Sequence, residues 1–168
     1  MGNVILIGMP GSGKSTLGVV IAKKLNMHFI DSDLVIQEKY GKTLEELIDE
    51  NGDAGFIKIE NDVNVGINVD NAVIATGGSA VYGDEAMRHF KETGLVVFLD
   101  VPVEEIQERI GSLKERGVVS NGKTDIDEIF DDRDMLYRKY ADVTYSQRHN
   151  MLRESVEELC QIIKDNRR

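Results

Sequence analysis

The sequence predicts an α/β fold of three layers (αβα), in which helices cover both faces of a parallel five-stranded sheet. Short apolar runs, of the kind that is buried on both faces, alternate along the chain with stretches of helical periodicity. This alternation indicates βαβ units, whose helices lie on the two faces of a parallel sheet. A glycine-rich segment, GMPGSGKST, joins the first apolar run to the first helical stretch, which is typical of a P-loop fold. We expect a single domain over residues 1–168, since a chain of this length can bury one core.

The first half of the chain opens with a continuous apolar run, NVILIG, that predicts a strand buried on both faces. Leu17, Ile21 and Leu25 recur at helical spacing in the segment that follows. Thr43 and Glu46 are spaced as a capping box, which predicts the start of another helix. We expect strands over 3–8, 28–33 and 72–79, and helices over 15–26, 34–41, from 43 onward and over 54–69.

The second half of the chain continues the alternation with the apolar run LVVFLDV and a short last strand, DVTYS. Residues 112–124 combine charged side chains with glycines and show little periodicity, so they predict a mobile loop. We expect strands over 95–101 and 142–146, and helices over 83–94, 103–110, 125–141 and 151–165.

The composition excludes several classes of partner. The net charge of −10 disfavours nucleic-acid binding, which normally needs a basic surface, and requires that an anionic ligand be held by a local positive site. No apolar stretch approaches the roughly 20 residues that span a bilayer, so we expect no membrane partner. Cys160 is the only cysteine, which favours a reducing compartment. We therefore expect a cytoplasmic protein, and a monomer.

The glycine-rich segment predicts a phosphate-binding loop. Gly8, Gly13, Lys14 and Ser15 match the pattern G-x-x-x-x-G-K-[ST], in which backbone N–H groups surround phosphate oxygens. Lys14 would reach the outer phosphates and act in catalysis, while the Ser15 hydroxyl would bind Mg²⁺. The alternative is a glycine-rich turn without a ligand, and the loop alone does not choose a reaction. The residues predicted to bind the nucleotide here are Gly11, Ser12, Gly13, Lys14, Ser15 and Thr16.

Acidic residues and glycines follow two of the predicted strands. Asp31 and Asp33 end the second strand, where ligands bind in open α/β sheets. One carboxylate can hold Mg²⁺ through water, and the other can orient or deprotonate an attacking hydroxyl group. Alternatively, Asp33 could be the N-cap of the next helix. Gly77 and Gly78 would let the backbone approach a small ligand, or they could form a simple turn after the third strand.

Over nearly its whole length the chain resembles the shikimate kinase family, within the nucleoside-monophosphate-kinase-like P-loop kinases. The resemblance implies ATP as phosphate donor, shikimate, a small hydroxy acid, as acceptor, a strand order of 2-3-1-4-5 and a place in aromatic amino-acid biosynthesis. The motifs that carry it are GMPGSGKST, FIDSD, GDAGFIKIE, VIATGGS, VVFLDV, RGVV and RDMLYRKYAD.

The resemblance also implies roles on the acceptor side. An acceptor-binding segment would extend over about residues 33–62. Asp33 is similar to the group that binds, and can deprotonate, the acceptor hydroxyl. Gly77 and Gly78 are similar to glycines that line the acceptor pocket. Arg133 is similar to the arginine that holds the acceptor carboxylate; without the resemblance it could equally be a surface ion-pair partner.

On the nucleotide side, the resemblance makes Ser15 and Asp31 the magnesium-side residues. Arg109 is similar to an arginine that stacks on adenine. Arg116 is similar to a catalytic arginine in a lid, here about residues 112–124, that closes over ATP. Such a group would neutralise charge on the transferring phosphoryl group. Without the resemblance, Arg116 could be a solvated loop charge.

The chain departs from the family pattern at two positions of the acceptor pocket. Ile57 stands where the family has a second carboxylate-binding arginine, and Ser79 replaces the third glycine of a triplet. Lys58 should face elsewhere, since one residue turns a helix by about 100°. Losing a charged hydrogen bond costs roughly 1.5–3 kcal/mol. The alternative function is therefore a P-loop kinase of a different hydroxy acid or sugar acid, and we hypothesise that Ile57→Arg would tighten shikimate binding.

Two other functions are less consistent with the residues. A nucleoside monophosphate as acceptor would need another cation for its phosphate, and residues 54–69 offer only Lys58. A regulatory nucleotide-binding module that uses GTP would usually carry Asn-Lys-x-Asp, which the sequence lacks.

Overall fold

One parallel five-stranded sheet organises the computed structural model, which describes residues 2–110, 118–123, 125–147 and 151–166. The strand order β2-β3-β1-β4-β5 confirms the order that the family resemblance implied. On the central strand, Ile5 lies in register with Ile74 of β3 and Val96 of β4. The strands are β1 (Asn3–Ile7), β2 (His28–Asp31), β3 (Ala72–Ala75), β4 (Gly94–Asp100) and β5 (Val143–Ser146).

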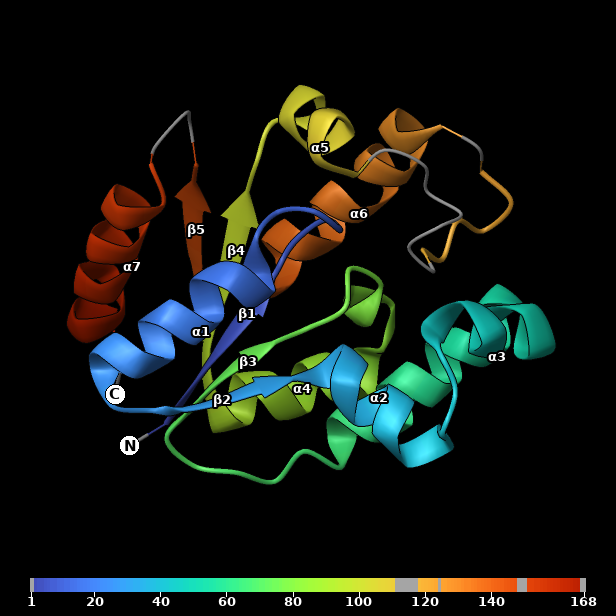
Figure 1. The fold of residues 1–168 in the computed structure, drawn as a ribbon, viewed down its shortest axis with the longest axis horizontal. Helices are drawn as coiled ribbons and strands as arrows, with labels where there is room; N and C mark the ends of the chain where they lie inside the picture. Colours follow the sequence, from blue (N-terminus) through green and yellow to red (C-terminus); the bar gives the residue numbers. More distant parts are fainter. Residues whose placement is uncertain (1, 111–117, 124, 148–150, 167–168) are drawn as a thin grey trace.

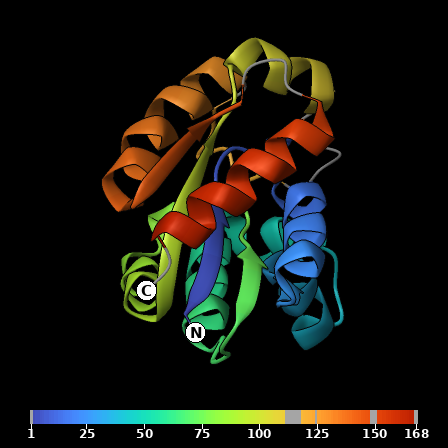
Figure 2. The same cartoon turned by 90° about the vertical axis from the view of Figure 1, so that its left-hand side faces the viewer.

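Helices cover both faces of this sheet (Figures 1 and 2), which confirms the predicted three-layer αβα fold. Helices α1 and α7 lie on one face, where Figure 2 shows α7 crossing the strands, and α4 and α6 lie on the other. The helices are α1 (Lys14–Leu25), α2 (Ser32–Tyr40), α3 (Leu44–Val65), α4 (Asp84–Thr93), α5 (Val103–Ile110), α6 (Ile126–Tyr140) and α7 (Leu152–Asn166), with a 3₁₀ turn η1 (Ala80–Tyr82).

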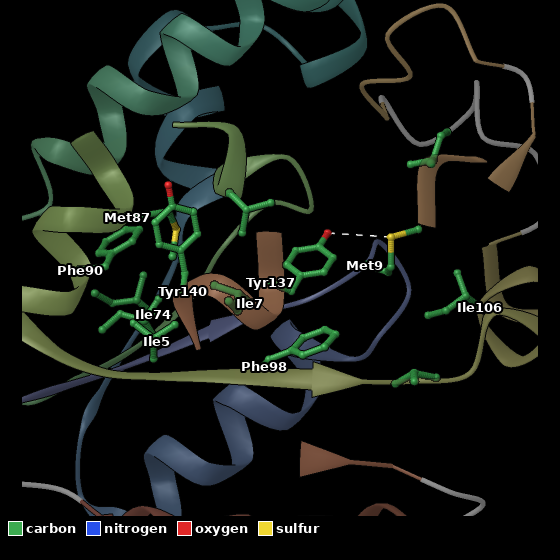
Figure 3. Packing of buried hydrophobic residues seen from close by; sticks show 14 of the residues in the cluster. Ile5, Ile7, Met9, Ile74, Met87, Phe90, Phe98, Ile106, Tyr137 and Tyr140 are labelled. Atoms are coloured by element: carbon green, nitrogen blue, oxygen red, sulfur yellow. Dashed lines mark hydrogen bonds between the residues drawn. The ribbon is translucent and has the colours of Figure 1, made fainter. Parts of the chain in front are cut away.

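The central strand explains why its sequence is apolar throughout. Successive side chains of a strand point to opposite faces, so Val4 and Leu6 pack under α1 and α7, while Ile5 and Ile7 pack under α4 and α6. Figure 3 shows the second of these clusters, in which the Phe98 and Tyr137 rings stack with centroids 5.0 Å apart.

A third apolar cluster lies apart from the sheet and belongs to the predicted acceptor-binding segment. It joins α2 and α3 to the described end of the predicted lid. Its buried members are Ile36, Leu47, Phe56, Val63 and Val119.

Three local features differ from the expectations. Helix α2 begins at Ser32, because the Asp31 side chain accepts a hydrogen bond from the Asp33 N–H at 3.0 Å; the N-cap is Asp31, and the alternative that placed Asp33 there is wrong. Helix α3 ends at Val65 rather than at residue 69; its break at Gly52, where φ is 70° and ψ is 172°, separates the two helices that the sequence predicted there. The turn η1 was not predicted. The capping box at Thr43 is confirmed.

Membrane spans were sought among the helices in the described ranges. None of them combines the length and the apolar character that a crossing of the bilayer requires.

The stacked rings of Phe98 on β4 and Tyr137 on α6 should contribute strongly to stability. We expect Phe98→Ala to lower the free energy of unfolding by about 3–5 kcal/mol, since it leaves a cavity at a side chain that is 1% exposed. The control is Met135→Ala, on the same helix as Tyr137 but 73% exposed, which should change it by no more than about 0.5 kcal/mol. Urea denaturation measures both, and similar losses in the two variants would contradict this assignment of the core.

Candidate active site

A cavity of about 660 Å³ lies at the carboxyl ends of the central strands. The P-loop, the first turn of α2, one face of α3, the loop after β3 and α6 contribute to its wall. Ser12 and Asp31 are outside the lining but contact residues within it. The predicted site residues that line the cavity are Gly11, Gly13, Lys14, Ser15, Thr16, Asp33, Gly77, Gly78, Arg109 and Arg133.

The P-loop adopts the shape that its glycines permit. Gly11 has a φ of +79°, and a Cβ atom there would lie 2.8 Å from the Ile110 side chain. Gly13 caps α1 in the left-handed conformation and offers no side chain to its first turn. The N–H groups at the start of α1 are therefore suited to phosphate oxygens.

The Lys14 ammonium is buried at the base of the loop. It donates hydrogen bonds to the carbonyl oxygens of Gly8 and Met9, both at 2.8 Å. Burial lowers the pKa of Lys14 to about 8, an effect that Asp33 opposes. A bound phosphate would add negative charge beside the ammonium and raise this pKa again.

Ser15 and Asp31 form an oxygen-rich pair beside the loop. The Ser15 hydroxyl donates to Asp31 Oδ2 at 2.6 Å. A hydroxyl and a carboxylate oxygen fit Mg²⁺, which usually takes one or two protein ligands and completes its shell with phosphates and water. The described residues contain no cluster of three or more histidine, cysteine or acidic side chains that could hold a metal alone. The pair therefore suits a metal that arrives with a nucleotide.

Asp33 lies in the same cavity, between the phosphate loop and the loop after β3. Burial, and next the negative charge of Asp31, raise the pKa of Asp33 to about 6, while Lys14 opposes the shift. The Asp33 carboxylate packs so closely on Gly77 that a Cβ atom there would lie 2.7 Å from Asp33 Oδ1. Because Asp31 caps α2, the Asp33 side chain is left to face the cavity.

Arg133 is buried, with 1% of its surface exposed, so the surface ion-pair alternative is wrong. Its Nη2 donates to the Val119 carbonyl oxygen, and its guanidinium lies over the Tyr82 ring, 5.4 Å from the centroid. Within the described part of the chain, Nε and Nη1 have no hydrogen-bond partner. Unpaired buried donors are costly, and an anionic ligand such as a carboxylate would satisfy a donor of this kind.

The two remaining arginines that the sequence predicted for the site are Arg109 and Arg116. Arg109, near the end of α5, lines the cavity, donates to the Gly11 carbonyl oxygen at 3.3 Å and pairs with Glu105 at 3.0 Å. It therefore lies beside the phosphate loop. Arg116 and most of the predicted lid fall outside the described residues. In the described part, 118–123, the Asn121 N–H donates to Asp53 Oδ2 of α3 at 2.5 Å.

Sequence reasoning missed Glu60, which lines the cavity and is 1% exposed. Burial raises the pKa of Glu60 to about 7, with Asp33 as the next cause. Phe56 and Glu60 are four residues apart on α3, so the helical spacing that places Phe56 in the core also points Glu60 inward. Ile57 instead packs on the third apolar cluster and does not line the cavity.

The fold and this site define a P-loop phosphotransferase: a phosphate-binding loop, a carboxylate beside it and a buried cation for an anionic acceptor share one cavity. The family model for shikimate kinase matches residues 10–164. The chain belongs to the shikimate kinase family, phosphotransferases that act on a hydroxyl group.

Relatives and solved structures agree with this assignment. A shikimate kinase of Clostridium botulinum (strain Eklund 17B / Type B) is 44% identical over 81% of this chain and 82% of its own length. Another, from C. botulinum strain Alaska E43 / Type E3, is 41% identical over 97% and 98%. The structure of shikimate kinase from Acinetobacter baumannii in complex with shikimate has a TM-score of 0.90 and 31% identity, covering 99% of this chain and 94% of that one.

The tight packing around Gly77 yields a prediction. We expect Gly77→Ala to displace the Asp33 and Glu60 carboxyl groups and to lower kcat/KM for the acceptor by at least about tenfold, which corresponds to the roughly 1.4 kcal/mol that such overpacking costs. The affinity for ADP should stay within about threefold, since the phosphate loop is untouched. Steady-state kinetics and ADP titration measure the two effects. Unchanged acceptor kinetics would show that the reaction does not depend on the positions of the Asp33 and Glu60 carboxyl groups.

Proposed function

We propose that this chain transfers the γ-phosphate of ATP to a hydroxyl group of shikimate, giving ADP and 3-phosphoshikimate. The observation that carries the proposal is the buried Arg133, whose Nε and Nη1 have no partner in the described structure, in one cavity with Lys14 and Asp33. This arrangement suits an acceptor that combines a carboxylate with a hydroxyl group. Membership of the shikimate kinase family supports the same donor and acceptor.

On the nucleotide side, backbone N–H groups of residues 11–16 would hold the phosphates, and Lys14 would leave its carbonyl partners to meet the outer ones. Ser15 would bind Mg²⁺ directly and Asp31 through water; the metal neutralises phosphate charge. Arg109, beside the loop, would lie against adenine. These roles follow from the family resemblance and agree with the positions of the side chains.

On the acceptor side, Asp33 would accept a hydrogen bond from the acceptor hydroxyl and direct its oxygen to the γ-phosphorus. A new P–O bond forms there, the bond from the γ-phosphorus to the oxygen bridging the β- and γ-phosphates breaks, and ADP leaves. The hydroxyl proton passes to Asp33 and then to solvent. Lys14 and, from the lid, Arg116 would offset the charge on the transferred group. Positioning and charge account for the catalysis.

A different hydroxy acid or a sugar acid is the second candidate acceptor, because no arginine stands at position 57. Ile57 packs on the third apolar cluster, so its side chain offers the ligand no replacement contact.

We also propose that residues 1–168 act as one cytoplasmic, monomeric domain without nucleic-acid or membrane partners. The net charge of −10 supports the first exclusion. Residues of α2 and α3 in the cavity wall, among them Leu44 and Phe56, support 33–62 as the acceptor-binding segment. The lid is proposed for 112–124.

A coupled assay of ADP release with a panel of acceptors tests the function. We expect ATP turnover that depends on shikimate and is absent with hydroxy acids lacking its ring hydroxyls. In the same assay Asp33→Asn should lower kcat by about 10²–10⁴-fold while ATP still binds. Turnover without any acceptor would indicate a nucleotide-hydrolysing module, and turnover with another acid alone would identify the second candidate.

Arg133 should determine affinity for the acceptor carboxylate. We expect Arg133→Lys to raise the acceptor KM about ten- to a hundredfold, because a lysine cannot donate two parallel hydrogen bonds to one carboxylate. The control is Arg138→Lys on the same helix, where the arginine forms half-exposed ion pairs with Asp100 and Asp134 and should change KM little. Equal increases of the acceptor KM in the two variants would show that Arg133 does not bind the acceptor carboxylate.

A further inference from the structure

One carboxyl oxygen of Glu60 accepts a hydrogen bond, and the other has no hydrogen-bond partner in the described part of the chain. The Ser79 hydroxyl donates to Glu60 Oε2 at 2.5 Å, and Ser79 is the residue that replaces the family's third glycine. Glu60 Oε1 has no hydrogen-bond partner among the described residues, although the side chain is almost completely buried and lines the cavity. A buried polar atom of this kind is costly unless a ligand meets it.

Glu60 Oε1 and Arg133 Nη1, both without a hydrogen-bond partner in the described structure, lie against neighbouring glycines of the loop after β3. A Cβ atom at Gly77 would collide with Glu60 Oε1, and one at Gly78, the next residue, would lie 3.0 Å from Arg133 Nη1. One short loop therefore contacts both an unpaired carboxyl oxygen and an unpaired guanidinium nitrogen. An acceptor carboxylate held by Arg133 would come close to Glu60.

The protonation state of Glu60 decides whether it repels an acceptor carboxylate or binds it. An ionised Glu60 would repel the acceptor carboxylate, whereas a carboxylic acid has an O–H group that can donate to it. Hydrogen bonds between an O–H donor and a carboxylate are short and strong. We infer that Glu60, oriented by Ser79, binds the acceptor carboxylate as a carboxylic acid and so takes over the contact that an arginine at position 57 would make. The inference rests on the proposed function.

The ionisable groups that face Glu60 agree with a protonated side chain in the complex. Burial and the negative charge of Asp33 on α2 raise its pKa, to about 7, while the hydrogen bond from Ser79 and the charges of Arg133 on α6 and Lys14 on α1 lower it. An acceptor carboxylate adds a second negative charge and raises the pKa of Glu60 further. Acceptor binding therefore takes up a proton above about pH 7, and the affinity falls as the pH rises, by up to about tenfold per unit.

Calorimetric titration of the full chain with shikimate tests this, in buffers of different ionisation enthalpy at about pH 8. From the buffer dependence of the binding heat we expect an uptake of close to one proton per shikimate bound. Glu60→Gln should take up almost none, keep the affinity within about threefold because its amide N–H replaces the acid O–H, and remove the dependence of affinity on pH. Glu60→Ala should bind about ten- to a hundredfold more weakly.

The matched control is Glu45→Gln on the same helix, where the side chain is exposed and the proton uptake should equal that of the unmodified chain. ADP affinity reports whether each variant is folded. Shikimate binding without proton uptake, or a Glu60→Gln variant as weak as Glu60→Ala, would overturn the role of Glu60 and leave the proposed function standing. If shikimate is neither bound nor phosphorylated, both proposals fall.

Discussion

Charge compensation inside one buried cavity is the constraint on which the site depends. Two cations, Lys14 and Arg133, and two carboxyl groups, Asp33 and Glu60, line this cavity. Lys14, Arg133 and Glu60 are buried, and Asp33 is partly buried. Each group is stable there only because the others offset its charge or because a ligand will. Burial shifts all three pKa values in favour of the neutral form: that of Lys14 falls to about 8, and those of Asp33 and Glu60 rise to about 6 and about 7. The opposite charges nearby counteract part of each shift.

The strand order brings these groups together. Strands β2, β3 and β1 are neighbours, so the residues that follow them, Asp33, Gly77 and Lys14, meet at one edge of the sheet. Arg133 reaches this edge from α6, which the stacking of Tyr137 on Phe98 fixes to β4. The Tyr137 hydroxyl also donates to the Gly78 carbonyl oxygen at 2.6 Å and so connects α6 to the loop that packs against Arg133.

Much of the fold and part of the site could be predicted because their signals are local. The P-loop is a contiguous motif, and continuous apolar runs mark three of the five strands, β1, β3 and β4. Glu60 could not be predicted in the same way, since its burial depends on Ser79 and Gly77 from another part of the chain. The N-cap role of Asp31 was missed for a different reason: two aspartates stand one residue apart, and only the backbone geometry decides which of them caps the helix.

The third apolar cluster supports part of the cavity wall separately from the sheet. Ile36, Leu47 and Phe56 pack with one another and with Val119 rather than with the sheet. Substitutions in α2 and α3 should therefore affect mainly the stability of this cluster, while the two larger clusters continue to support the sheet edge near Lys14, Asp33 and Gly77. Ile57 packs against this third apolar cluster. A substitution in this cluster can therefore reshape one part of the cavity wall while the phosphate loop and the core beneath it stay in place.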